Sequence, residues 1–196
     1  MKKISLVLIN PLTTWFLLAH PHVFIDYTVD FMFNENGLIG MKTEWFFDEM
    51  YSSMLLQDYD VNKDGEFSSD EIVKTEKDAF SNLANYNYFI YITNKDKCLK
   101  VRTVSDFSVR VSEDRVIYNF FIAYVVPANP SYQEIEVCMY DETYYVDLLP
   151  MGENPVHFSN AETIDYEYEV FEDTKESKNY GEIYPYSIRL MFRKKE

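Results

Sequence analysis

Oxygen-bearing side chains alternate along the segment from Asp60 to Glu71. Asp60, Asn62 and Asp64 stand at its first, third and fifth positions, and Glu71 stands at its twelfth. A hard divalent ion takes roughly six to eight oxygen ligands, and a tightly coiled loop turns alternate side chains toward its centre. We therefore expect the following residues to bind Ca²⁺, with Glu66 acting through its backbone carbonyl: Asp60, Asn62, Asp64, Glu66, Ser68 and Glu71.

The residues around these ligands favour a loop between two helices. Gly65 permits the sharp turn that needs a positive φ. Apolar residues recur at helical spacing on both sides of the loop: Phe47, Met50, Tyr51, Met54 and Leu55 before it, and Ile72, Ala79, Phe80 and Leu83 after it. The segment resembles an EF-hand over residues 45–84. The alternative is an acidic turn in which Ser68 and Glu71 form only a capping box.

The charge of this loop predicts weak calcium binding. Three of its side-chain ligands are carboxylates, and the chain has no second loop of this kind to pair with it. A dissociation constant on the order of 10⁻⁴ M or weaker suits extracellular calcium concentrations. We therefore expect a structural calcium ion rather than a calcium-dependent switch.

The beginning of the chain has the pattern of an export signal. Lys2 and Lys3 precede a mostly apolar run that ends at Ala19. A charged start followed by an apolar run and a small residue is typical of a cleaved signal peptide, here residues 1–19. An uncleaved membrane anchor is the alternative, although the run is short for a membrane span. We expect a periplasmic or secreted protein without a stable membrane span after cleavage.

Cleavage after Ala19 would create a second set of metal ligands. The mature chain would then begin with His20, and His22 and Asp26 would follow on the same face of a strand. A terminal amine and imidazole nitrogens suit Cu²⁺, Ni²⁺ or Zn²⁺. His157 is the remaining histidine and the candidate distant partner. The alternative is an exposed terminus without a metal.

The rest of the chain is predicted to form strands. Alternating apolar residues run from Val23 to Phe33, and a turn at residues 34–37 joins this strand to residues 38–46. Further strands are expected at residues 86–93, 99–111, 115–126, 135–140, 144–149, 163–171 and 183–192. The predicted fold class is mainly β (α+β). We expect one antiparallel β-sandwich-like domain over residues 20–196, with the EF-hand inserted at residues 45–84.

Charge and cysteine content limit the partners. The chain of 196 residues has a formal net charge of −15. This acidity argues against nucleic acid and anionic lipid as partners. Cys98 and Cys138 are the two cysteines, and the sequence leaves open whether they form a disulfide.

Several motifs together resemble a secreted bacterial family of unknown function. They are residues 20–26 (HPHVFID), 44–49 (EWFFDE), 53–60 (SMLLQDYD), the loop above and 140–147 (YDETYYVD). Members of this family are often labelled as the periplasmic component of an uncharacterised ABC-type transport system. Here Thr143 stands where the family often has Pro, and Phe24 where it often has Trp. Because members are commonly found beside nickel, cobalt or zinc transport systems, the resemblance implies metal ions, Co²⁺ among them, and a membrane metal-transport system as partners.

No pattern of an enzyme is found. The chain has no nucleophile elbow, no HExxH, no phosphate loop and no dinucleotide fingerprint. We therefore expect a calcium-binding protein with an accessory role in handling transition metals. One alternative is a calcium-stabilised module that binds a protein or a glycan, with Tyr144 and Tyr145 as platform candidates. A further alternative is a copper oxidase with a histidine-chelated metal.

Overall fold

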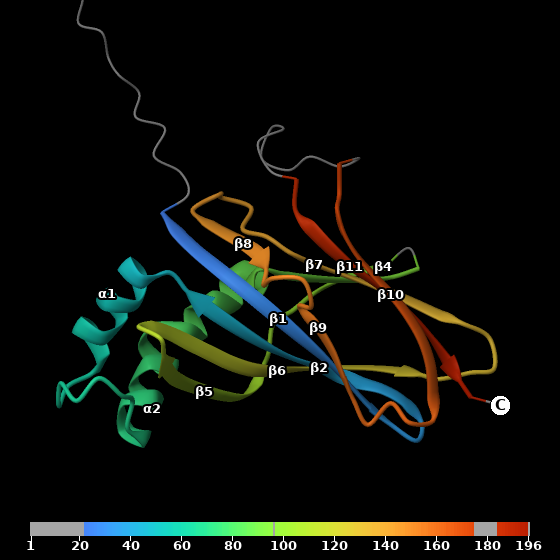
Figure 1. The fold of residues 1–196 in the computed structure, drawn as a ribbon, viewed down its shortest axis with the longest axis horizontal. Helices are drawn as coiled ribbons and strands as arrows, with labels where there is room; N and C mark the ends of the chain where they lie inside the picture. The colour runs from blue at the N-terminus through green and yellow to red at the C-terminus, as the bar shows by residue number, and fades with distance from the viewer. Residues whose placement is uncertain (1–21, 96, 175–183, 196) are drawn as a thin grey trace, which may run out of the picture.

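The computed structural model describes residues 22–95, 97–174 and 184–195 (Figure 1). The predicted signal peptide and His20 lie outside these residues, as does part of the charged loop before the last strand. The described chain is mainly β, with two sheets and a helical segment that follows the second strand. No helix in the described part is long and apolar enough to cross a membrane.

The first sheet has the strand order β5-β6-β2-β1-β8, and β9 also pairs with β1. Its strands are β1 (Val23–Asn34), β2 (Gly37–Phe47), β5 (Ser105–Ser112), β6 (Arg115–Pro127), β8 (Val146–Pro150) and β9 (Val156–Ser159). The predicted hairpin is confirmed, because β1 and β2 pair in antiparallel register with Asn34 opposite Gly37. The expected interior position of β6 is also confirmed, since it lies between β5 and β2.

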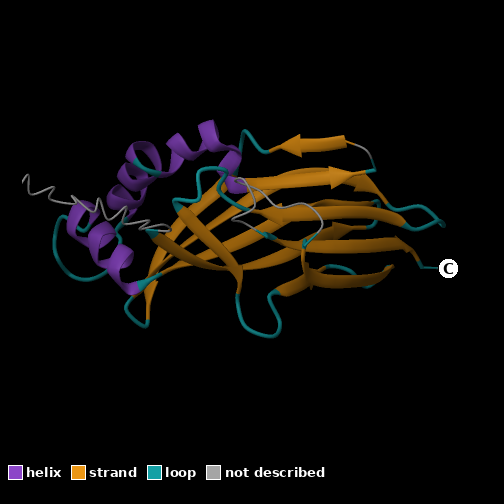
Figure 2. Ribbon diagram, turned by 90° about the horizontal axis from the view of Figure 1, so that it is seen from above, coloured by secondary structure: helices purple, strands orange, loops and turns teal. Residues whose placement is uncertain are grey.

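The second sheet has the order β10-β11-β7-β3-β4. Its strands are β3 (Ile90–Asn94), β4 (Lys97–Lys100), β7 (Gln133–Met139), β10 (Ile164–Glu172) and β11 (Tyr186–Lys194). Buried side chains of both sheets form one hydrophobic cluster, with Phe31 and Trp45 from the first and Ile92 and Leu190 from the second. Two sheets that share a core are consistent with a sandwich-like arrangement (Figure 2).

Apolar and mostly polar residues alternate along β1 and give the strand two different faces. Val23, Ile25, Tyr27, Val29, Phe31 and Phe33 are all at most 4% exposed, as the period of two predicts. Asp26, Thr28 and Asp30 lie on the opposite face and are partly exposed. The first strand therefore supplies the core with one side and a polar surface with the other.

The first sheet is not purely antiparallel, which corrects the predicted arrangement. Both β8 and β9 pair with β1 in parallel. The 12-residue β1 is longer than either partner, so β8 covers its first half and β9 its second half. Strand β9 was missed because only four residues separate Pro155 from Asn160, too few to show a period.

Two predicted strands have different bounds in the structure. The expected strand at 99–111 is divided into β4 and β5, which belong to different sheets. The expected strand at 86–93 begins only at Ile90, because Asn87, Tyr88 and Phe89 have positive φ angles and extend a 3₁₀ segment instead. Local backbone conformation therefore overrides the β propensity of these aromatic residues.

Two helices and a 3₁₀ segment gather at one end of the molecule (Figures 1 and 2). They are α1 (Glu49–Tyr59), α2 (Ser69–Asp78) and η1 (Phe80–Phe89). The predicted apolar stripe of α1 is only partly correct, since Met50 and Met54 are more than half exposed. Leu55 of the predicted stripe is buried, and so is Ser52, which was not part of it.

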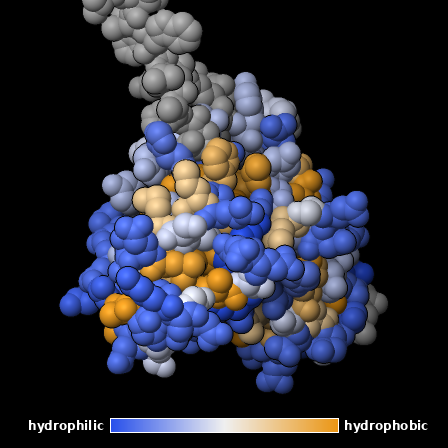
Figure 3. Space-filling view, turned by 60° about the vertical axis from the view of Figure 1, so that its left-hand side comes forward, coloured by the Kyte–Doolittle hydropathy of each residue, from blue (hydrophilic) through white to orange (hydrophobic). Residues whose placement is uncertain are grey.

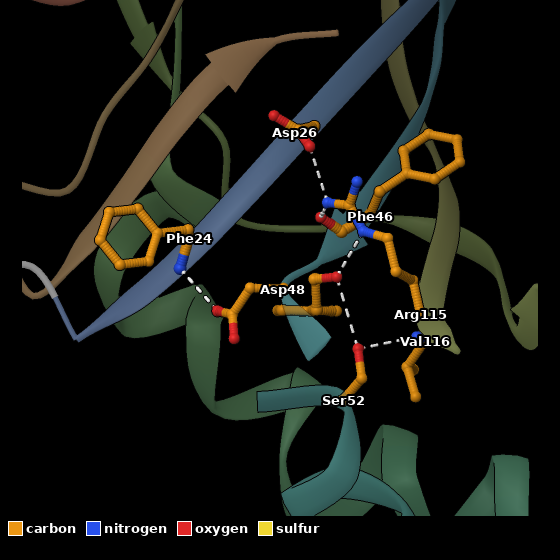
Figure 4. Close-up of polar contacts among 8 residues, drawn as sticks. Phe24, Asp26, Phe46, Asp48, Ser52, Arg115 and Val116 are labelled. Carbon is orange, nitrogen blue, oxygen red and sulfur yellow. Dashed lines mark hydrogen bonds and ion pairs between the residues drawn. The ribbon is translucent and has the colours of Figure 1, made fainter. Parts of the chain in front are cut away.

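Hydrogen bonds fix the start of α1 to the first sheet (Figure 4). Asp48 caps the helix by accepting from the Tyr51 N–H, and its other carboxylate oxygen accepts from the Phe24 N–H at 3.0 Å. The buried Ser52 hydroxyl accepts from the Val116 N–H at 2.8 Å. The helix is thereby tied to β1 on one side and to β6 on the other.

Arg115 on β6 joins this strand to β1 and β2 from the outer face. Its side chain donates to the carbonyl oxygens of Phe46 and Phe47, and it pairs with the Asp26 carboxylate at 2.7 Å. The arginine lies at the start of β6, next to the end of β2, and links the two strands where β2 leaves the sheet (Figure 4). Asp26 is therefore occupied by an ion pair.

The two cysteines do not form a disulfide with each other. Cys98 pairs with Thr93 on one side of β3, and Cys138 pairs with Tyr91 on its other side. Two strand spacings amount to about 10 Å, which exceeds the Cα separation that a disulfide spans. The question that the sequence left open is answered by this topology.

Replacing Ser52 by Ala should destabilise the fold, because the Val116 N–H would remain buried without its acceptor. The expected loss in unfolding free energy is about 1–3 kcal/mol, measured by urea denaturation. Ser53→Ala on the exposed side of the same helix is the control, with an expected change within about 0.5 kcal/mol. Equal effects of the two substitutions would contradict the role given to the Ser52 hydroxyl.

Candidate functional site

The loop between α1 and α2 contains all the predicted calcium ligands. Asp60 follows the last residue of α1 and Ser68 precedes the first residue of α2. Asp60 and Glu71 are 8% and 5% exposed, whereas the residues between them are mostly exposed. The two ends of the loop therefore place two carboxylates in buried positions.

Asp60 organises the first half of the loop. One of its carboxylate oxygens accepts from the Lys63 N–H at 2.7 Å and from the Asp64 N–H at 3.3 Å. The other oxygen accepts from the Gly65 N–H at 2.9 Å, and Gly65 has a φ of +83°. Successive amides turned toward one carboxylate coil the chain tightly around it, and glycine adopts the required turn without strain.

Asn62 and Asp64 continue this coil. The Asn62 side-chain oxygen accepts from the Asp64 N–H at 2.9 Å, and its amide group donates to Asp64 at 2.8 Å. Asp64 in turn accepts from the Glu66 N–H at 2.9 Å. The residues at the first, third and fifth positions thus all bend back over the loop backbone.

Glu71 connects the end of the loop to its beginning. One oxygen accepts from the Val61 N–H at 2.7 Å and from the Asn62 N–H at 3.3 Å. The other accepts from the Ser68 N–H and hydroxyl at 2.8 and 2.7 Å, which is a capping box for α2. The capping alternative accounts for the contacts with Ser68 but not for those with Val61 and Asn62.

The donor set of the loop fits a hard cation. Neither Asp60 nor Glu71 forms an ion pair with a described residue, so loop amides and the Ser68 hydroxyl balance two buried carboxylates. Oxygen atoms are the ligands that Ca²⁺ prefers, and an added cation would compensate this charge. Within the described ranges, no three His, Cys, Asp or Glu side chains are already close enough to bind one metal ion. Calcium binding would require the carboxylates to converge.

The structure separates the residues of the predicted transition-metal site. His22 precedes β1, and its ring lies 4.9 Å from that of Tyr145. Asp26 pairs with Arg115, while His157 on β9 stands opposite Asp30. At about 3.3 Å per residue, the four steps along the strand from Asp26 to Asp30 span about 13 Å. His157 is thus not brought to Asp26, and His20 lies outside the described residues.

A cavity of about 360 Å³ next to this helical segment was not predicted from sequence. Its walls come from β1, β2, β6, α1, η1 and the loop between β7 and β8. Asp141 in that loop is 3% exposed and accepts hydrogen bonds from Thr143, Tyr145 and Val146. The lining residues are far apart in the chain and share no spacing, so no local sequence signal points to them.

Protonation of Glu71 in acid should lower the stability of the fold. Hydrogen bonds from the Ser68 hydroxyl and N–H, then from Val61 and Asn62, lower the pKa of Glu71 from 4.5 to about 2. A carboxyl group whose pKa is lower in the folded state stabilises the fold above its unfolded pKa. This stabilisation is lost as the pH falls from about 4.5 toward 2. Wild-type protein in EDTA should therefore lose more unfolding free energy over this range than Glu71→Gln does.

Glu66→Gln is the matched control for this experiment. It removes the same charge from the same loop, but the Glu66 side chain is exposed and accepts none of the loop hydrogen bonds described above. Its acid dependence, followed by circular dichroism, should match that of the wild type. A Glu71→Gln profile that parallels the wild type over the whole range would refute the lowered pKa.

Comparison with known proteins identifies relatives over most of the chain. A family model described as "Protein of unknown function (DUF1007)" matches residues 6–180. An uncharacterised protein of Haemophilus influenzae is 27% identical over 161 residues, which cover 81% of this chain and 76% of that protein. An uncharacterised 15.5 kDa protein in the trpE 3' region of Spirochaeta aurantia is 28% identical over 102 residues, 52% of this chain and 72% of that protein. No solved structure matches the chain significantly. The chain therefore belongs to the DUF1007 family.

Proposed function

We propose that this chain is an exported calcium-binding protein whose loop from Asp60 to Glu71 acts as a single EF-hand. The observation that supports this function is the inward coil of the loop. Asp60, Asn62 and Asp64 fold over the backbone, and Glu71 reaches back to Val61 and Asn62. An ion would replace amide hydrogens as the main partner of these oxygens. The ligands are Asp60, Asn62, Asp64, Ser68, Glu71 and the Glu66 carbonyl.

The position of the loop supports a structural role for calcium. The loop joins α1, which is fixed to β1 and β6, to α2, which leads into η1 against the core. The hydrogen bonds between α1 and the first sheet lie at the first turn of the helix, whereas the loop follows its last turn. Calcium would stabilise the other end of the helix pair. In this proposal the EF-hand is an insertion in a sandwich-like domain.

We extend the proposal to a transition-metal role for His20 and His22 only. Asp26 and His157 are left out, because the first pairs with Arg115 and the second stands opposite Asp30. A terminal amine with two imidazoles would accept Cu²⁺, Ni²⁺, Zn²⁺ or Co²⁺ and deliver it to a membrane transport system. The role is that of an accessory protein without catalytic activity.

An alternative function is a calcium-stabilised module that binds a protein or a glycan. Aromatic side chains at the edge of the second sheet favour it: Tyr166 and Tyr168 are 40% and 42% exposed, and both rings contact Phe158. Exposed rings of this kind stack on the apolar faces of ligands. In this alternative His20 and His22 carry no metal.

Calcium should raise the thermal stability of the wild-type protein. At a free calcium concentration one hundred times the dissociation constant, the expected gain is about 2.7 kcal/mol. Asp60→Ala and Glu71→Ala should abolish the calcium-dependent rise in melting temperature, because each removes a buried ligand. Glu66→Gln keeps the backbone carbonyl and should retain the rise.

The comparison of melting temperatures with and without millimolar calcium decides between the two interpretations of the loop. No rise for the wild type would leave the acidic turn with a capping box. A rise that persists in Asp60→Ala would place the calcium ion elsewhere. Elemental analysis of protein purified without chelators gives an independent measure of the bound ion.

The transition-metal role depends on His20 being the first residue of the mature chain. N-terminal sequencing of exported protein should begin with His20. Calorimetric titration with Ni²⁺, Cu²⁺ and Zn²⁺ should then show binding that is lost in the His20→Ala, His22→Ala variant but kept in His157→Ala. A different first residue, or unchanged affinity in the double variant, would remove the basis for this role.

A further inference from the structure

β10 forms one edge of the second sheet, and only one of its two sides is paired within the described residues. It pairs with β11 over all 9 of its residues without a register shift. Natural edge strands are usually kept from pairing with other chains by a bulge, a proline, a lysine or a short length. The strand Ile164–Glu172 has none of these features. Its unpaired side, called the open edge below, is therefore suited to receive a further strand.

Alternate residues of β10 direct their backbone groups toward the open edge. The Asp173 N–H donates to the carbonyl of Pro185, the residue opposite it in the register. The odd-numbered residues of β10 therefore bond with β11, and the even-numbered residues point away from it. Accordingly, the N–H and C=O groups of Tyr166, Tyr168 and Val170 face the open edge. None of them has a backbone hydrogen bond to another described residue.

A cleft of about 310 Å³ lies beside the open edge. Tyr168 and Val170 line it from β10, and Pro150 and Pro155 line it from the segment that runs from β8 to β9. The four consecutive β10 residues 166–169 are all exposed. The open edge and the space next to it are therefore accessible from solvent.

The face of β10 that borders this cleft is aromatic. The Tyr166 ring stacks on Phe158 of β9 with 3.9 Å between the ring centroids, and the Tyr168 ring lies 5.3 Å from the same phenylalanine. These contacts hold two partly exposed rings in place, so they can pack on apolar side chains at a low cost in entropy. The described lining of the cleft contains no Lys, Arg or His, and Glu153 is its charged residue. We therefore expect apolar residues on this side of an added strand.

The other face of β10 is acidic. Glu167 and Glu169 lie on it, opposite to the tyrosines, and both are exposed. Glu169 shares the Arg189 side chain with Glu134 and Glu136. Glu167 forms no ion pair with a described residue. Negative charge is thus in excess on this face, so we expect Lys or Arg on the corresponding side of an added strand.

A second copy of the chain fits the open edge poorly. If two β10 strands paired about Tyr168, Glu167 of one copy would stand opposite Glu169 of the other, and like charges in such positions are destabilising. Hydrophilic side chains surround the apolar ones on the face shown in Figure 3, and the formal net charge of the chain is −15. Two copies would therefore repel each other, whereas a basic partner is attracted from a distance.

We propose that the open edge of β10 binds an extended segment of a basic protein in which Lys or Arg alternates with apolar residues. The segment adds a strand to the second sheet, and its backbone bonds with Tyr166, Tyr168 and Val170. Its apolar side chains enter the cleft, and its cations lie beside Glu167 and Glu169. This gives the protein-binding alternative a defined partner. It requires neither calcium nor a transition metal, so it holds or fails independently of the calcium site.

A labelled heptapeptide of alternating Lys and Val tests the proposal by fluorescence anisotropy with the full chain in EDTA. It should bind about tenfold more tightly than the same peptide with Glu in place of Lys, because like charges would then meet across the strands. Added calcium should leave its affinity unchanged. N-methylation of one alternate set, either the Val or the Lys residues, should abolish binding, whereas methylation of the other set should preserve it. Only one edge of an added strand bonds with β10.

Substitutions in β10 separate the backbone contribution from the side chains. Tyr168→Pro removes an N–H at the open edge without removing a bond to β11, so the protein should remain folded while the affinity falls about tenfold. Tyr168→Ala keeps this N–H and should lose less. Glu167→Gln should weaken binding several-fold, whereas Glu76→Gln on α2 should not change it. Melting temperatures show that each variant is folded.

Several outcomes would overturn the proposal. They are equal binding of the Lys and Glu peptides, and equal effects of the two methylated sets. Another is a folded Tyr168→Pro variant that binds as tightly as Tyr168→Ala. Unchanged affinity in Glu167→Gln would contradict the role of charge even if Tyr168→Pro did not fold. Sedimentation that shows dimers of the wild type but not of Tyr168→Pro would assign the open edge to a second copy instead.

Discussion

The structure depends on the first strand being paired along both of its edges. β2 covers one edge of β1 in antiparallel register, and β8 and β9 divide the other edge between them in parallel. All the inward side chains of β1 are buried, so a shift of one residue would turn an aromatic and aliphatic face outward. The segments that carry potential chemistry are connected to this strand. The Asp48 cap binds at Phe24, and the loop before β8 binds at His22 and Val23.

The helical segment also depends on contacts with the first sheet. Asp48 and Ser52 fix the beginning of α1, whereas the loop after its end is coiled by its own carboxylates. Buried acidic groups balanced by amide and hydroxyl dipoles, without a counter-charge, are stable only when every oxygen is engaged. That is why Asp60 and Glu71 accept several hydrogen bonds each. In the proposed function the same oxygens would bind a cation, which would replace several weak partners by one strong partner.

Sequence patterns could predict the parts of this structure that depend on local spacing. The β1–β2 hairpin, the helix-loop-helix and the interior position of β6 follow from period, turn residues and apolar content. The parallel pairing of β9 could not be predicted, because four residues show no period and their partner is more than a hundred positions away. The aromatic residues Tyr88 and Phe89 favour a strand, but their positive φ angles exclude it. The sequence could name His157 as a ligand, but only topology shows that it faces Asp30.

The cavity and the loop are connected through the same helical segment. The last turn of α1 enters the loop, and α2 leads at Ala79 directly into η1, whose residues line the cavity. A cation that draws Asp60 and Glu71 together would fix the angle between α1 and α2. Tyr51 on α1 and Phe80 on η1 both belong to the cavity wall, so that angle also sets its width. In the proposed function, calcium would thus act on the shape of the cavity through geometry alone.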